Sequence, residues 1–324
     1  MREAFSRVAL LEAGLVLFAA ILPLFAAPYW IHVGALAWYY ALLAASWALL
    51  AGYAGQFSFA QCAFGALGGY ASALGVMKLG FSPATSILFA VFLAVCAGAL
   101  MGWLVLRLSG PYLALFTLAI SEIFRLILIA EEPLTRGSLG LPVAGLYAHG
   151  GDTAYYYTGL ALLLASLLAM RGLLATRLGL FLRALREDEG AARASGVNTT
   201  FCKILIFVVT SGIAALAGAY YGHFVGILTP SIVIIPETAL VIAMAVIGGI
   251  ESLSGAVIGA VLVYGLSEVL RGEGEWRFVL LGLALILIQR FAQNGLFPVI
   301  EHALAPRRPL PLSARPGEAS HGQD

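Results

Sequence analysis

Long apolar stretches occupy most of this sequence and restrict it to one kind of fold. Runs of about 17–25 predominantly apolar residues can cross the hydrocarbon core of a bilayer as helices, and such runs follow one another here with short polar interruptions. Hydrophobic residues make up 61% of the 324 positions and charged residues 11%. So few charges cannot cover a water-soluble surface. The sequence therefore predicts an all-α integral membrane protein and excludes a soluble globular enzyme.

The apolar stretches define the expected number of membrane spans. Ten stretches are candidates, and the last three are short enough that two of them can form a broken or re-entrant pair. We therefore expect a polytopic bundle of about eight to ten transmembrane helices, with ten preferred. The candidates are residues 8–27, 33–53, 57–76, 84–106, 112–130, 155–170, 202–222, 238–250, 256–270 and 277–290.

Lysine and arginine are distributed unevenly between alternate loops. With ten spans and an inner N-terminus, the inner segments carry thirteen of these residues and the outer segments four. Because cytoplasmic loops carry an excess of Lys and Arg, both termini are expected in the cytoplasm. Residues 1–305 are expected to form one transmembrane domain with a cytoplasmic loop at 171–203. The tail 306–324 is rich in Pro, Gly, Ser and Arg and is expected to be disordered.

Several catalytic and binding signatures are absent from the sequence. ATP hydrolysis needs a phosphate cradle such as GxxxxGK[ST], but neither of the two lysines, Lys78 and Lys203, follows a glycine. GxSxG and HExxH are also missing. The three cysteines form no CxxC pair, and His32, His149 and His223 have no ligand-like spacing, so no metal or other cofactor is expected. The net charge of +1 argues against a nucleic-acid partner. The chain is predicted not to be an enzyme.

Two charged residues lie near the middle of the stretch 112–130. Glu122 and Arg125 are three positions apart and therefore share one helical face. Charges at this depth are costly, so they face the bundle interior or a water-filled path. One interpretation is a structural ion pair between helices, and the other is a pathway pair, which the nearby Thr117 and Ser121 favour slightly.

The long inner loop 171–203 contains two expected helical parts. In the first, apolar residues share one face opposite Arg183 and Arg186, so this part can lie along the membrane surface. The second is a short helix at about 188–195, in which Asp188 is a good N-cap and Gly196 is well placed as a left-handed C′ residue.

The short helix has the character of a docking element. Its alanines, including Ala191 and Ala192, project little and would let a partner surface come close, while its acidic residues lie at the positive helix N-terminus. The alternative is a merely solvated charged loop. The residues that we assign to the docking loop are Arg186, Glu187, Asp188, Glu189, Gly190, Ala191, Ala192 and Gly196.

The segment RALREDEGAARASGVN resembles the EAA-type cytoplasmic loop of ABC-importer permeases, specifically the branched-chain amino-acid permease family. Other segments resemble the same family in the expected order over about positions 50–270, and the pattern is more similar to the larger of its two permease subunits. These segments are GYAGQFSFAQCAFGALGGY, GPYLALFTLAISEIFR, LTRGSLGL and AVIGGIESLSGAVIGA.

The resemblance implies a permease subunit in the bacterial cytoplasmic membrane, without a cofactor of its own. It would form half of the translocation path for branched-chain amino acids, together with a second similar permease, two cytoplasmic ATP-binding subunits and an external substrate-binding protein. Three positions depart from the family pattern: Glu251, Ala256 and the pair Gln61-Cys62. These departures leave the substrate open, because related permeases carry urea, short amides or other amino acids.

Two other functions compete with this interpretation. One is a proton-coupled secondary transporter that uses Glu122 as the protonation site, and the other is a purely structural membrane subunit. The residues that we assign to a translocation path or a buried polar cluster are Gln56, Ser58, Gln61, Thr117, Ser121, Glu122 and Arg125.

Overall fold

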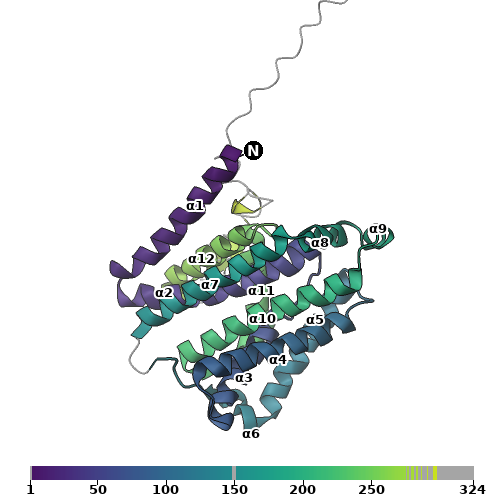
Figure 1. Cartoon of the computed structure of the whole chain (residues 1–324). Helices are drawn as coiled ribbons and strands as arrows, with labels where there is room; N and C mark the ends of the chain where they lie inside the picture. Colours follow the sequence, from purple (N-terminus) through teal and green to yellow (C-terminus); the bar gives the residue numbers. More distant parts are fainter. Residues whose placement is uncertain are drawn as a thin grey trace, which may run out of the picture.

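The computed structural model is a bundle of long helices (Figure 1). It describes residues 2–147 and 151–274, and beyond these only scattered positions between 276 and 297. Within the described part, seven helices are long and apolar enough to cross a membrane. The predicted all-α polytopic fold is confirmed. The predicted tail 306–324 and most of the candidate span 277–290 lie outside the described residues.

The helices follow the apolar stretches, with a few short elements between them. The single strand pair joins β1 to β2 in antiparallel fashion among the described residues. The elements are α1 (Arg2–Ile21), η1 (Leu22–Leu24), α2 (Pro28–Ala48), the π-helical η2 (Leu49–Tyr53), α3 (Gln61–Leu79), α4 (Pro83–Leu104), α5 (Pro111–Ala130), α6 (Glu132–Thr135), η3 (Gly137–Leu139), β1 (Leu141–Pro142), α7 (Gly151–Ala175), α8 (Arg177–Glu187), α9 (Glu189–Ala194), α10 (Thr199–Val225), β2 (Ile227–Leu228), η4 (Pro230–Val233), α11 (Ile235–Gly248), α12 (Leu253–Val269) and η5 (Leu270–Glu273).

Two interruptions depart from straight membrane spans. The expected span 57–76 starts later, because residues 55–60 are not helical and α3 begins at Gln61. The second interruption precedes α11, which has 14 residues and is therefore about 21 Å long. That is shorter than a hydrocarbon core of about 30 Å. The predicted short helix near the C-terminal end is thus present in α11, whereas α12 with η5 (253–272) is long enough to cross the membrane.

The helix α10 forms the centre of the bundle, and 17 of its 27 residues are buried. It packs most extensively on α4 and α3, which lie beside it in Figure 1. Glycines allow this close approach: a methyl group at Gly68 would lie 2.2 Å from the carbonyl oxygen of Ala215, and one at Gly102 would lie 2.8 Å from Cα of Ile204. Small residues are a common device for bringing membrane helices together. The helices α3, α4 and α10 therefore form one tightly packed group.

The helices α8 and α9 lie together at one end of the bundle, at the right of Figure 1. Leu182 and Leu185 of α8 are buried, whereas Phe181 stays exposed. The apolar face expected at the membrane surface thus packs partly on the protein itself. The short helix begins at Glu189 and ends at Ala194, close to the predicted bounds of 188–195.

Candidate functional site

The non-helical residues 55–60 form the base of the candidate site. Their backbone groups are satisfied by side chains from two helices. Trp47 donates its Nε1–H to the carbonyl of Ser58 at 2.8 Å, the N–H of Phe59 donates to Oγ1 of Thr117 at 3.0 Å, and Ser121 Oγ donates to the carbonyl of Phe59 at 3.1 Å. Non-helical backbone at membrane depth is tolerated where protein buries it or where it lines a cavity. Thr117 and Ser121 therefore stabilise this break, the non-helical segment between η2 and α3.

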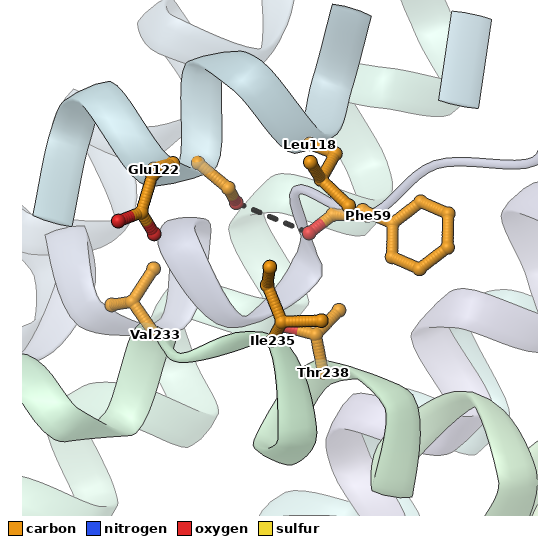
Figure 2. A pocket seen from close by; sticks show the side chains of 7 residues that line it. Phe59, Leu118, Glu122, Val233, Ile235 and Thr238 are labelled. Carbon is orange, nitrogen blue, oxygen red and sulfur yellow. Dashed lines mark hydrogen bonds between the residues drawn. The ribbon is translucent and has the colours of Figure 1, made fainter. Parts of the chain in front are cut away.

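A small, partly open cavity lies beside this break (Figure 2). Its walls come from the break, from α5, and from η4 with the start of α11. Ser121 and Glu122 are near the middle of the 20-residue α5, so the cavity lies about halfway along that helix. The lining residues are Phe59, Leu118, Ser121, Glu122, Val233, Ile235 and Thr238.

Glu122 and Arg125 form the ion pair that their spacing indicates. Arg125 Nε donates to both carboxylate oxygens of Glu122, at 3.0 and 2.9 Å. The side chains remain 36% and 24% exposed, respectively, so this chain alone does not enclose them. The helix that carries them, α5, buries only four of its twenty residues. The pair thus lies on the open side of the cavity, and Glu122 lines it.

Gln56 in the break and Gln61 at the start of α3 lie outside the cavity lining. Gln61 donates from Nε2 to Ser46 Oγ at 2.6 Å and to the carbonyl of Thr210 at 3.1 Å. Gln56 donates to the carbonyl of Ala54 at 3.2 Å. Both side chains are buried, and their Oε1 atoms have no hydrogen-bond partner among the described residues. Ser58 is also buried, and its Oγ accepts from the N–H of Ala60. Of the candidates, Ser121 and Glu122 therefore line the cavity, Arg125 pairs with Glu122, and Thr117 holds the adjacent backbone of Phe59. Gln56, Ser58 and Gln61 lie outside the lining.

Glu237 was missed in the sequence analysis. It lies in the first turn of α11, where it accepts a hydrogen bond from Tyr40 at 3.1 Å, and the ring of Tyr40 stacks on Tyr264 with 4.9 Å between centroids. The available signal was an acidic residue inside the apolar run IVIIPETALVIAM, one position before the predicted span. A carboxylate in such a run indicates a functional position.

The side chain of His223 in α10 is buried. Its ring nitrogens lie 2.8 Å from Ser72 Oγ and 2.6 Å from the carbonyl of Ala144. Within the described part of the chain, no three His, Cys, Asp or Glu side chains are arranged to hold a metal ion. His223 thus joins α10 to α3 and to the loop before α7.

The local structure of α9 follows the predicted capping pattern. Asp188 accepts from the N–H of Ala191 at 2.9 Å as the N-cap, and Gly196 adopts a left-handed φ of +85° after the helix. Of the two central alanines, Ala191 is exposed, whereas Ala192 is 5% exposed and faces its own chain. Ala192 packs inward, so of these two alanines only Ala191 is accessible to a partner surface, and the assignment of α9 to docking stays a prediction. Glu187 and Gly190 are exposed beside Ala191.

Arg186 connects the loop to η2 and to the turn between α11 and α12. It donates from Nη1 to the carbonyl of Gly52 in η2 at 2.7 Å, and it forms an ion pair with Glu251 in the turn between α11 and α12. Glu251 is one of the departures from the family pattern. Because it contacts the loop and does not line the cavity, it gives no information about the substrate.

Sequence comparison identifies the family to which this protein belongs. Residues 31–289 match the family model for the permease component of the branched-chain amino acid transport system. This chain belongs to that family. The permease is 30% identical over 264 residues to the LivM permease protein of the high-affinity branched-chain amino acid transport system of Salmonella typhimurium. That alignment covers 73% of this chain and 62%, less than two thirds, of the relative.

Relatives of two types are similar to this permease. It is 28% identical over 297 residues to the LivM protein of Escherichia coli, with 83% of this chain and 70% of the relative aligned. It is also 28% identical over 283 residues to the Escherichia coli LivH permease protein, with 79% and 90% aligned. No solved structure matches the chain. The relatives are transport permeases rather than enzymes. The family that the sequence resembles is confirmed, and the seven apolar helices agree with a multi-pass membrane protein.

Proposed function

We propose that this permease is the membrane subunit of an ATP-driven importer for branched-chain amino acids or a related small polar solute. The observation that carries the proposal is α9, a capped helix that is exposed at one end of the bundle, on a chain without a phosphate cradle. Two ATP-binding subunits would dock on the α8–α9 end in the cytoplasm. An external binding protein would deliver the solute at the other end.

The translocation path would run beside α5. Charges at mid-membrane depth face a bundle interior or a water-filled cavity, and Glu122 and Arg125 are only partly covered by this chain. A second, homologous permease packed on the exposed side of α5 would enclose the pair and the cavity. Ser121, Thr238 and Glu122 would then offer polar groups to the passing solute.

Transport would proceed by alternating access. ATP binding by the partner subunits would shift the population between outward-open and inward-open states through its differential affinity for the two. The helix break at 55–60 and the start of α11 would be best placed to change, because both line the cavity. Arg186 would link the loop to the segment before the break, through the Gly52 carbonyl, and to the turn after α11, through Glu251. No bond in the solute is made or broken.

Transport of leucine is expected to require ATP and the partner subunits. The chain is reconstituted in vesicles alone and with the ATP-binding subunits, the second permease and the binding protein, and uptake of labelled leucine is measured. Uptake is expected only in the complete system with hydrolysable ATP. If the chain alone gives robust uptake with a proton gradient, the importer proposal is wrong and the proton-coupled transporter with Glu122 replaces it.

Ala191→Trp is expected to disrupt docking while leaving the bundle intact. Ala191 is exposed on the six-residue α9, a rigid element about 9 Å long, so a bulky ring there would keep a closely fitted partner away. We expect normal membrane insertion with lost recovery of the ATP-binding subunits, or ATP turnover without uptake.

The matched control is Ala175→Trp, an exposed alanine at the end of α7 in the same loop region but outside α9. It should leave complex recovery, ATP turnover and uptake unchanged. Wild-type values of all three quantities for Ala191→Trp would mean that α9 touches no partner and that the loop is merely solvated.

A further inference from the structure

Lys203 is a buried cation at the start of α10. Its side chain is 2% exposed, and its Nζ lies 2.8 Å from Oε2 of Glu189 in α9. The same ammonium group donates to the carbonyl oxygen of Leu106, just beyond α4, at 3.2 Å. One side chain therefore connects the docking helix, α10 and the end of α4.

An ion pair of this kind is a poor source of stability. Burying an ammonium group costs much of what its partner returns, and apolar side chains of similar size often replace a buried pair without loss. The pair instead fixes the position of its two helices relative to each other, because the ammonium must lie within hydrogen-bond distance of particular oxygens. The role that the geometry favours for Lys203 is to hold α9 in one place.

The helix α9 needs such an anchor because it is too short to be stable alone. It has six residues, whereas isolated helices shorter than about 12–15 residues are marginal in water. Glu189 also pairs with Arg193 at 3.0 Å, but the Arg193 side chain is 67% exposed. An exposed pair contributes little. The buried contact with Lys203 is therefore the stronger constraint on the position of α9.

The anchor also reaches the cavity-bearing helix. At Gly102 the backbones of α4 and α10 approach so closely that an added methyl group would lie 2.8 Å from Cα of Ile204. The two helices therefore move together. Leu106 lies in the short connection from α4 to α5, and α5 carries Ser121 and Glu122 of the cavity. Displacement of α9 would therefore pull on Lys203 and, through Lys203, on the Leu106 carbonyl.

We infer that Lys203 is a positioning residue that transmits movement of α9 to the α4–α10 pair and onward to α5. The inference rests on the proposed import function and names the residue through which ATP-driven movement reaches the membrane. Loss of the ammonium group should leave docking and ATP hydrolysis in place but reduce the amount of solute moved for each ATP.

The test uses the reconstituted complete transporter with Lys203→Met, which keeps the length of the side chain and removes its charge. We measure recovery of the complex, ATP turnover and leucine uptake. Expected are wild-type recovery and turnover, with uptake per ATP lowered about tenfold, as is common when contacting residues in one network are separated. The matched control is Lys78→Met, at the exposed last turn of α3, which should keep the wild-type ratio.

If Lys203→Met is not recovered, because Glu189 loses its buried partner and keeps only the exposed Arg193, the variant Lys203→Met/Glu189→Met removes both charges and is measured instead. A wild-type ratio of uptake to ATP in the recovered single variant, or in this double variant, overturns the inference. If the wild-type complex takes up leucine without ATP, the proposed function fails. If the wild-type complex is ATP-driven and the variant stays fully coupled, only the role of Lys203 fails.

Discussion

Gly218→Ala is expected to prevent normal assembly of the bundle. A methyl group at Gly218 in α10 would lie 1.7 Å from the carbonyl oxygen and 2.4 Å from the carbonyl carbon of Gly65 in α3. Backbone atoms cannot turn away as a flexible side chain can, so α3 and α10 would have to separate. Overpacking of this kind costs about 1–3 kcal/mol and occasionally more, and we expect the upper end. The measurements are the yield of monodisperse protein in detergent and its Tm.

The control for this variant is Gly265→Ala in α12. No atom lies within 4 Å of a methyl group at Gly265, and alanine is the better helix former by about 0.5–1 kcal/mol. Gly265→Ala should therefore match or slightly exceed the wild-type Tm. Equal yields and Tm values for the two variants would mean that α3 and α10 do not cross at Gly65 and Gly218.

Glu122→Gln is expected to lower leucine uptake by the complete transporter by about tenfold, within the usual range for the separation of contacting residues. The substitution leaves the guanidinium of Arg125 without its bidentate partner in the middle of α5. A charge at that depth is unfavourable unless it is paired or hydrated. The double variant Glu122→Gln/Arg125→Gln removes both charges and should recover part of the loss.

Measurement of both complex recovery and uptake distinguishes a structural ion pair from a carboxylate that contacts the solute. Recovery of both quantities in the double variant would indicate a mutually compensating ion pair. If the double variant is as poor as the sum of the single variants, Glu122 and Arg125 do not act together, and direct contact of Glu122 with the solute gains support. The matched control is Glu131→Gln, an exposed carboxylate just beyond the end of α5, which should behave as the wild type.

The features that were predictable from sequence depend on nearby residues. The apolar stretches predicted the helices. Asp188 and Gly196 predicted the two ends of α9, because capping depends on residues within a few positions of the helix end. The Glu122–Arg125 contact follows from a spacing of three on one helix. Each of these interactions lies within a single turn of the chain, so the sequence alone carries it.

The features that were missed depend on residues far apart in the chain. Residues 55–60 look apolar enough to continue a span, but Trp47, Thr117 and Ser121 provide hydrogen-bond partners for a non-helical backbone. Lys203 gave no sign of burial because one of its partners, the Leu106 carbonyl, is 97 positions away. The inward direction of Ala192 likewise depends on packing that a helical pattern of six residues does not reveal.

The glycine-lined crossing of α10 with α3 and α4 has a consequence for synthesis of the protein. The helices α3 and α4 leave the ribosome first, and roughly 95 residues separate the end of α4 from the start of α10. At about 5–20 residues per second, this interval lasts roughly 5–20 s. During that time α10 itself is absent, so the glycine-lined surfaces of α3 and α4 lack the helix on which they pack in the finished bundle. The most tightly packed group of the bundle is thus completed only after α5 to α9 have been synthesised.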